Sequence, residues 1–356
     1  MNRIDAFLEL AVKQGGSDLH MVAGEPLRIR LHGDLQSIRF RDLTARDVDE
    51  FLEEFMTEDQ RRGLAAEHAV DFAYESATAG RFRANVYRHA GGLGAALRVV
   101  PTHAPELASL GLPDAVRHLL AVGKGLMLVT GPTGSGKSTT LAAMVRHVNE
   151  TRRGHILTLE DPIEFVHANA QCVVTQREIG THAVSFGHAL RDAVREDADV
   201  ILVGEMRDPE SIALALTAAE TGVLVLGTLH TNGAVRCVDR IVNSFPGCRQ
   251  DQVRAMLADS LRLVVSQQLV RKADRSGRLV AAEVLVNTSA VGAIIRQGQT
   301  HKLLSAIQSG SRAGMQSLDN VLMDLARKGV ITGDEAQDHA VDRGAFAAIA
   351  SQDPAA

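Results

Sequence analysis

The stretch LMLVTGPTGSGKSTTLAAMVRHV, residues 126–148, decides the fold of the central part of this chain. It begins with a short apolar run that predicts a buried strand, continues through a glycine-rich turn, and ends in residues with helical spacing. The turn, GPTGSGKST at 131–139, fits the pattern G-x-x-x-x-G-K-[ST]. Strand, glycine-rich loop and helix in this order predict a loop that binds phosphate.

The residue types of this loop suit a nucleoside triphosphate and its metal ion. Gly134 and Gly136 allow backbone N–H groups to close around phosphate oxygens, and the helix N-terminus adds a partial positive charge. Lys137 is expected to reach the β- and γ-phosphates, and the Ser138 hydroxyl is expected to ligate Mg²⁺. The predicted nucleotide-binding residues are Gly131, Pro132, Thr133, Gly134, Ser135, Gly136, Lys137, Ser138 and Thr139.

Further short apolar runs surround the loop and alternate with helical stretches. They are ILTLE (156–160), VILVG (200–204) and VLVLG (223–227). Continuous apolar strands separated by helices predict a parallel α/β sheet covered on both faces. From about residue 250 the chain is expected to become mostly helical, through QVRAMLADSLRLVVSQQLV (252–270) and SLDNVLMDLARKG (317–329).

Acidic residues follow two of these predicted strands, at the edge where open α/β sheets bind ligands. In DVILVGEMRD (199–208), Gly204 stands where an Asp is usual, and Glu205 follows it. Glu205 can orient or activate a water that attacks the γ-phosphate, or it can be a plain acid in a strand-end turn. The segment LEDPIE supplies Glu160, Asp161 and Glu164, which suit metal or water binding but can also be solvated loop charges.

His230 follows the strand VLVLG and therefore lies at the same predicted edge. At this position an imidazole can hydrogen-bond the γ-phosphate and report whether it is present. The alternative is a cap for a helix that starts at Thr231 or Asn232. Position alone leaves both interpretations open.

The first hundred residues predict a small α+β unit. The expected elements are helices at 5–14 and 41–57, a strand at 27–35 and a hairpin at 80–100. In the hairpin, Arg81 and Arg83 fall on one strand face, and Phe82, Ala84 and Val86 fall on the other. The stretch PTHAPELASLGLP (101–113) is the predicted linker.

Composition is that of an ordinary globular protein, with 45% hydrophobic and 23% charged residues. The net charge of −5 and the lack of a dense Lys/Arg run argue against binding to nucleic acid. The three cysteines have no metal-ligand spacing, which suits a reducing cytosol. No apolar run approaches the ~18 residues of a membrane span. We therefore expect a cytoplasmic protein.

Four motifs, in order, resemble those of the secretion ATPases of type II and type IV pilus systems. GPTGSGKST, LTLEDPIE, VILVGEMRD and GTLHTN are similar to that family's Walker A motif, Asp box, atypical Walker B motif and His box. Within the family, the chain is most similar to the PilT-type pilus retraction ATPases. The segments at 15–35, 80–88 and 300–319 carry that similarity, which covers about residues 15–335.

The resemblance implies a PAS-like α+β domain followed by a RecA-like P-loop ATPase domain with a helical C-terminal subdomain. The implied bounds are 1–100 for the PAS-like domain, 101–113 for the linker, 114–285 for the ATPase core and 286–356 for the helical subdomain and tail. It also implies ATP as substrate and Mg²⁺ held by Ser138 and Asp161. The implied catalytic residues are Glu205, Glu160, Glu164, His230, Arg81, Arg83 and Arg98.

The resemblance further implies a homohexamer whose ATP-driven domain rotation disassembles a type IV pilus. Its implied partners are an inner-membrane platform protein and a paralogous retraction ATPase, with no nucleic acid. The implied location is cytoplasmic, peripheral at the inner-membrane base of the pilus machine. The alternatives are an accessory retraction paralogue, a pilus assembly or type II secretion ATPase, and a nucleotide-binding scaffold that does not hydrolyse ATP.

One segment departs from the pattern of the retraction ATPases. Gly292 and Ala293 replace an expected Arg-Asn pair, and Gln297 replaces an expected Glu. The family links this segment to retraction rather than to hydrolysis. Assembly ATPases typically carry a tetracysteine zinc motif, and this chain has no C-x-x-C pair.

Overall fold

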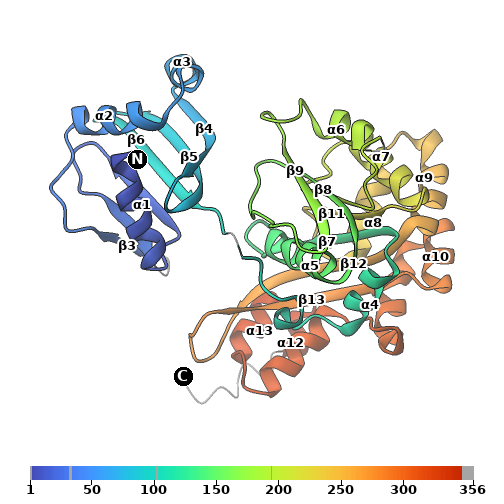
Figure 1. The fold of residues 1–356 in the computed structure, drawn as a ribbon. Coiled ribbons are helices and arrows are strands. Elements are labelled where there is room, and N and C mark those ends of the chain that lie inside the picture. The colour runs from blue at the N-terminus through green and yellow to red at the C-terminus, as the bar shows by residue number, and fades with distance from the viewer. Residues whose placement is uncertain (1, 32–33, 102, 194, 347–356) are drawn as a thin grey trace. The chain divides into compact units, whose positions relative to one another are not determined.

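The computed structural model describes residues 2–31, 34–101, 103–193 and 195–346, and these form two compact units (Figure 1). The first unit holds the residues up to His103 together with 164–166, and the second holds the rest. Residues 104–113, which the sequence predicts as linker, make their contacts with the second unit. The Arg146 guanidinium donates to the carbonyl of Ala104 at 2.7 Å, and Leu107 is buried in the core of the second unit. The assignment of the first unit as PAS-like and of the second as RecA-like stays a prediction.

The first unit is an antiparallel sheet with helices on one face (Figure 1). The strand order is β3-β2-β1-β6-β5-β4. The strands are β1 (Asp18–Val22), β2 (Arg28–Leu31), β3 (Asp34–Ser37), β4 (Ala69–Ser76), β5 (Gly80–His89) and β6 (Gly92–Val99), and the helices are α1 (Arg3–Lys13), α2 (Ala45–Phe55) and α3 (Glu58–Glu67). The predicted helices and hairpin are confirmed. Phe82, Ala84 and Val86 are buried under α1 and α2, whereas Arg83 is exposed, as the alternation predicts.

The second unit contains a seven-stranded sheet of the order β13-β12-β7-β11-β10-β8-β9. Its strands are β7 (Gly125–Thr130), β8 (Gly154–Glu160), β9 (Cys172–Glu178), β10 (Val200–Val203), β11 (Leu224–Leu229), β12 (Leu261–Arg271) and β13 (Arg278–Val286). All neighbouring pairs are parallel except β12 with β13. The four predicted strands and the predicted α/β class are therefore confirmed.

The helices of the second unit cover the sheet and form the C-terminal part. They are α4 (Asp114–Val122), α5 (Lys137–Thr151), α6 (Phe186–Ala193), α7 (Pro209–Glu220), α8 (Ala234–Asn243), α9 (Gly247–Ser260), α10 (Ser289–Arg296), α11 (Leu303–Ser309), α12 (Leu318–Arg327) and α13 (Gly333–His339), with 3-10 turns η1 (Leu107–Leu110), η2 (Thr300–Lys302), η3 (Ser311–Ala313) and η4 (Arg343–Phe346). A separate hydrophobic cluster joins Val270 and Ala281 of the β12–β13 hairpin to Leu322 and Phe346 of the C-terminal helices.

The expectation of a continuous helical stretch over 252–270 is wrong. Helix α9 ends at Ser260, and strand β12 begins at the next residue. The strand lies between β7 and β13 and is buried on both faces, so it lacks the alternation of apolar and polar residues that marks a half-exposed strand. An apolar run of this kind cannot be distinguished from a buried helix by its periodicity.

The segment that departs from the retraction ATPases falls on helix α10. Gly292 is buried, and a Cβ atom there would lie 3.4 Å from the carbonyl oxygen of Ala258 in α9. A long arginine side chain would start from this close contact between the two helices. Glycine at 292 therefore suits the packing of α10 on α9, and Ala293 next to it is only partly buried.

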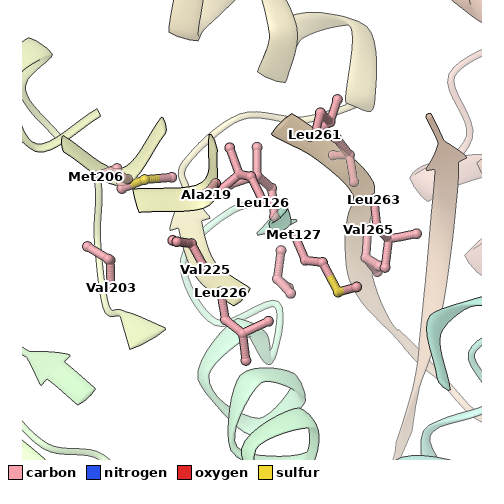
Figure 2. Close-up of a cluster of buried hydrophobic side chains, with 14 of the residues drawn as sticks. Leu126, Met127, Val203, Met206, Ala219, Val225, Leu226, Leu261, Leu263 and Val265 are labelled. Carbon is pink, nitrogen blue, oxygen red and sulfur yellow. The ribbon is translucent and has the colours of Figure 1, made fainter. Parts of the chain in front are cut away.

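The core of the second unit contains side chains of the strands and of the helices that cover them. Figure 2 shows Leu126 and Met127 of β7 beside Val225 and Leu226 of β11. All four are 1% exposed or less, because helices lie on both faces of the sheet. Burial of this kind contributes roughly 1.5–3 kcal/mol for each large side chain.

Leu226→Ala should therefore lower the free energy of unfolding of the second unit by about 2–5 kcal/mol, since it removes buried methyl groups and leaves a cavity. Urea unfolding followed by circular dichroism measures the change. The control is Val173→Ala on β9, where the side chain is 59% exposed and the expected loss is below about 1 kcal/mol. Equal losses in the two variants would contradict the placement of Leu226 in the core.

Candidate nucleotide site

The predicted phosphate-binding loop lies between β7 and α5, as the sequence predicts. Gly131, Gly134 and Gly136 have φ values of 143°, 79° and 86°, which L-residues with a side chain rarely adopt. A Cβ at Gly131 would also lie 2.3 Å from the carbonyl oxygen of Gln267 on β12. The loop therefore needs glycine for its backbone conformation and, at Gly131, for its contact with the neighbouring strand.

The loop carries the donors that a phosphate group requires. The Lys137 ammonium lies among the loop carbonyls and donates to those of Gly131 and Pro132, both at 2.9 Å. The hydroxyl of Ser135 is buried and has no hydrogen-bond partner in the part of the chain that the structure describes. A buried ammonium and an unpartnered hydroxyl beside a helix N-terminus fit an anionic ligand such as the phosphates of ATP.

Four loops meet at one edge of the sheet because their strands are parallel neighbours. In the register, Thr130 of β7 lies opposite Leu229 of β11, and Val203 of β10 lies opposite Leu159 of β8. The phosphate-binding loop, His230 and Glu205 follow the ends of β7, β11 and β10, and Glu160 is the last residue of β8. The fold thus brings the predicted loop, acids and histidine to the same edge.

At this edge, the Glu205 carboxylate contacts the side chains of two basic residues. Its Oε1 lies 3.0 Å from Nε2 of His230, and its Oε2 lies 2.6 Å from a guanidinium nitrogen of Arg207. Burial acts to raise the pKa of Glu205, but the hydrogen bond from Arg207 and the charges of His230 and Arg207 outweigh burial and hold the pKa below its usual value. Glu205 is therefore ionised and oriented, as a general base requires.

Arg207 is a site residue that the sequence reasoning missed. The side chain is 72% exposed, and its pKa is raised by the hydrogen bond and charge of Glu205 and, more weakly, by the charge of Asp161. Its position two residues after Glu205 in GEMRD indicates that it lies near the site, but only the structure shows that its guanidinium contacts the Glu205 carboxylate.

The missing Asp at position 204 has a steric reason. The Gly204 amide donates to the carbonyl of Leu159 at 2.7 Å, and a Cβ at 204 would lie 3.1 Å from that same oxygen. Contacts this short are rare for real Cβ atoms, so β8 or β10 would have to move to admit an Asp. The Thr228 hydroxyl donates to the Gly204 carbonyl from the other side. The first acid after the strand is therefore Glu205, and its role as the base stays a prediction.

The three acids of LEDPIE do not form one cluster. Oε1 of Glu160 accepts hydrogen bonds from Thr158 at 2.6 Å and from Gln176 at 3.1 Å. Asp161 lies within electrostatic range of Arg207, whereas Glu164 is exposed and belongs by its contacts to the first unit. Among residues 2–31, 34–101, 103–193 and 195–346, no group of three or more His, Cys, Asp or Glu side chains is placed to hold a metal ion. The pair Ser138 and Asp161, with phosphate oxygens and water, stays the predicted ligand set for Mg²⁺.

His230 does not cap the helix that follows it. Helix α8 begins at Ala234, not at Thr231 or Asn232. Side chains of β12 and β13 bind the backbone amides at the start of the helix instead. The Ser266 hydroxyl accepts from the Gly233 amide at 2.8 Å, and the Glu283 carboxylate accepts from the Ala234 amide at 2.7 Å. The His230 side chain is 45% exposed and contacts Glu205, and its predicted role as a phosphate sensor stays a prediction.

The three predicted arginines lie in the sheet of the first unit. Arg83 and Arg98 are directly opposite each other on β5 and β6, and Arg98 forms an ion pair with buried Asp18 at 2.8 Å. Nε of Arg83 lies 3.6 Å from Oδ1 of Asp71. Arg81, two residues earlier on β5, is partly buried. Like charges directly opposite each other in a sheet are unfavourable unless anions balance them. A role of these arginines toward nucleotide stays a prediction.

Known proteins are similar to this chain along nearly all of its length. The family model described as "Type II/IV secretion system protein" matches residues 1–337. The chain is 45% identical over 337 residues to the type IV pilus retraction ATPase PilT of Pseudomonas aeruginosa, covering 95% of this chain and 98% of that one. It is 39% identical to the type IV pilus ATPase PilU of the same organism, covering 94% and 88%.

A solved structure of the pilus retraction motor PilT with bound ADP is similar to the whole chain. The TM-score is 0.88 at 42% identity, and the match covers 96% of this chain and 98% of that one.

Removal of the Arg207 charge should change the pH dependence of any ATP hydrolysis that uses Glu205 as base. The lowered pKa keeps Glu205 ionised to more acidic pH, and activity is lost as the pH falls through that pKa. Arg207→Ala should raise the pKa and move the acidic limb of the kcat/KM profile toward higher pH by about one unit. Arg191→Ala, which breaks an exposed ion pair with Glu210, is the control and should leave the limb in place. An unmoved limb in Arg207→Ala would show that this ion pair does not set the pKa.

Proposed function

This chain belongs to the type II/IV secretion system protein family, and on that premise we propose that it is a PilT-type ATPase whose hydrolysis of ATP drives type IV pilus retraction. The observation that carries the proposal is the meeting of the phosphate-binding loop with the Glu205–His230 pair at one edge of a parallel sheet. Similarity to PilT along nearly the whole chain supports the coupling to retraction.

We propose that the second unit is a RecA-like core and the first a PAS-like domain. The support for the core is the strand order, in which β11 and β10 stand between the loop-bearing β7 and β8. This order places the strand of the proposed base next to the strand of His230 rather than next to the phosphate-binding loop. Glu205 and the loop then face the nucleotide from separate strands.

ATP binding would begin at the loop. Backbone N–H groups of 134–138 and the α5 N-terminus bind the phosphates, and Lys137 exchanges its two loop carbonyls for β- and γ-phosphate oxygens. Ser138 and Asp161 would hold Mg²⁺, which neutralises charge on the phosphates as the bond to the γ-phosphoryl group breaks. The glycine backbone and the unpartnered Ser135 hydroxyl support this fit.

Hydrolysis requires Glu205 to orient a water in line with the γ-phosphate. Each carboxylate oxygen contacts one basic side chain and keeps a second lone pair, which can accept a hydrogen bond from water. Arg207 is the more exposed of the two partners, and together with His230 it holds the carboxylate in place. The contact of His230 with the proposed base supports a role for His230 in sensing whether the γ-phosphate is present.

We further propose a homohexamer docked on the platform protein at the cytoplasmic face of the inner membrane, with rotation between the domains as the power stroke. The family relationship and the PilU relative support this arrangement, and a paralogous partner fits the same picture. None of the helices in the described part of the chain is both long and apolar enough to cross a membrane. Gly292 and Ala293 favour an accessory retraction motor as the second candidate, while the higher identity to PilT favours the main motor.

Glu205→Gln should lower kcat for ATP hydrolysis by at least about 10²-fold, because the amide cannot accept a proton from the attacking water. Binding of mant-ADP should persist, since the phosphate-binding loop is intact. Lys137→Ala should abolish mant-ADP binding as well as hydrolysis. The matched control is Glu220→Gln, an exposed acid at the end of α7, which should hydrolyse ATP at close to the wild-type rate. Wild-type turnover in Glu205→Gln would contradict the assignment of the base.

The cellular role is tested by deletion of the gene in its native host, scored for surface pili and twitching. Abundant pili without movement would establish retraction as the function. Loss of pili would indicate an assembly ATPase instead. Unchanged behaviour would point to an accessory motor. Where the deletion changes pili or movement, complementation with Glu205→Gln shows whether turnover is needed.

A further inference from the structure

Two successive residues of β12 contact two different parts of the site from opposite faces of the sheet. One contacts the phosphate-binding loop, and the other contacts the segment that follows His230. Ser266 and Gln267 are adjacent in the strand, so their side chains point in opposite directions. Both are nearly inaccessible, at 7% and 0% exposure. Neither side chain belongs to the nucleotide motifs, and both are polar in a strand that is otherwise largely apolar.

Gln267 contacts the phosphate-binding loop and the helix that follows it. Its Nε2 donates to the carbonyl of Ser135 at 2.7 Å, and its Oε1 accepts from the Thr140 hydroxyl at 2.9 Å. Its backbone carbonyl is also the atom that excludes a side chain at Gly131. A buried amide with both ends bonded fixes the loop relative to α5 and β12.

Ser266 lies on the other side and contacts the segment that follows His230. Its hydroxyl accepts from the Gly233 amide, and Glu283, directly opposite on β13, accepts from the Ala234 amide. Glu283 is 7% exposed. Burial raises the pKa of Glu283, and its bond from the Ala234 amide opposes that rise. The two acceptors fix the start of α8 and, through Thr231 and Asn232, the position of His230.

We propose that Glu283 and Ser266 are positioning residues for His230, and that Gln267 is a positioning residue for the phosphate-binding loop. The inference rests on the ATPase activity proposed above and deepens it. Gln267 of the β12–β13 hairpin holds the phosphate-binding loop. Ser266 and Glu283 of the same hairpin hold the segment that follows His230. A substitution that displaces the phosphate-binding loop should therefore leave the segment after His230 in place, and a substitution that displaces that segment should leave the loop in place.

The first test separates binding from turnover. Gln267→Ala should weaken mant-ADP binding and raise KM for ATP about tenfold, because the loop and α5 each lose one buried hydrogen bond that holds them to β12. Glu283→Ala should leave mant-ADP binding within about twofold of wild type and lower kcat about tenfold, because His230 is displaced from the reacting groups. The control is Gln268→Ala, which lies next to Gln267 but contacts His339, and which should change neither value. A loss of kcat and of binding in equal measure in both variants would overturn the proposal.

The second test asks whether Glu283 acts through His230. Glu283→Gln keeps an oxygen for the Ala234 amide and should restore kcat to within about threefold of wild type, whereas Glu283→Ala should not. In a His230→Ala background, Glu283→Ala should cost nothing further, since the residue that it positions is already gone. Additive losses, or equal losses in Glu283→Gln and Glu283→Ala, would overturn the assignment.

Hydrogen exchange gives a readout that does not depend on hydrolysis. In the full-length protein, Glu283→Ala should speed amide exchange in peptides covering 231–236 about tenfold, with Glu283→Gln unchanged and peptides covering β10 unchanged. Unchanged exchange in Glu283→Ala would overturn the positioning contact. If exchange responds as expected but the wild-type protein hydrolyses no ATP, the contact stands and the proposed function fails.

Discussion

The parallel pairing of β7, β11, β10 and β8 is the constraint on which the rest of this structure depends. Parallel strands require connections that cross over the sheet, so the helices must cover both faces and the strands must be apolar throughout. The same pairing places every strand-to-helix loop of the four strands at one edge. The phosphate-binding loop, Glu205 and His230, dispersed over about a hundred positions of the sequence, therefore lie at the same edge of the sheet. The short contact between Gly204 and Leu159 shows how closely this edge is packed.

The sequence was sufficient to predict the features that follow from local pattern. The phosphate-binding loop has a fixed spacing, and the four predicted strands are continuous apolar runs bounded by helices. The position of Glu205 and His230 at the same edge follows from the parallel sheet alone. These predictions needed no knowledge of which strand pairs with which.

What could not be predicted depends on the pairing of distant segments. Strand β12 has the apolar pattern of a buried helix, and only its ladders to β7 and β13 decide its conformation. The contact of Glu283 with the Ala234 amide joins positions 49 residues apart, through the register of β13 against β12. Arg207 is close in sequence to Glu205, yet its side chain could equally have pointed to solvent. The steric reason for Gly204 likewise needs the backbone of β8, which no local pattern contains.

The hydrophobic cluster at the far end of the hairpin has a mechanical consequence. Val270 and Ala281 fasten the C-terminal helices to the same two strands that carry Gln267 and Glu283. Val270 is three residues beyond Gln267, roughly 10 Å along an extended chain that cannot lengthen further. Any tension that a load applies to the C-terminal helices is therefore carried along the backbone to the nucleotide site with almost no slack. In a motor with such a stiff connection, a force on the C-terminal helices would act directly on the site that binds ATP.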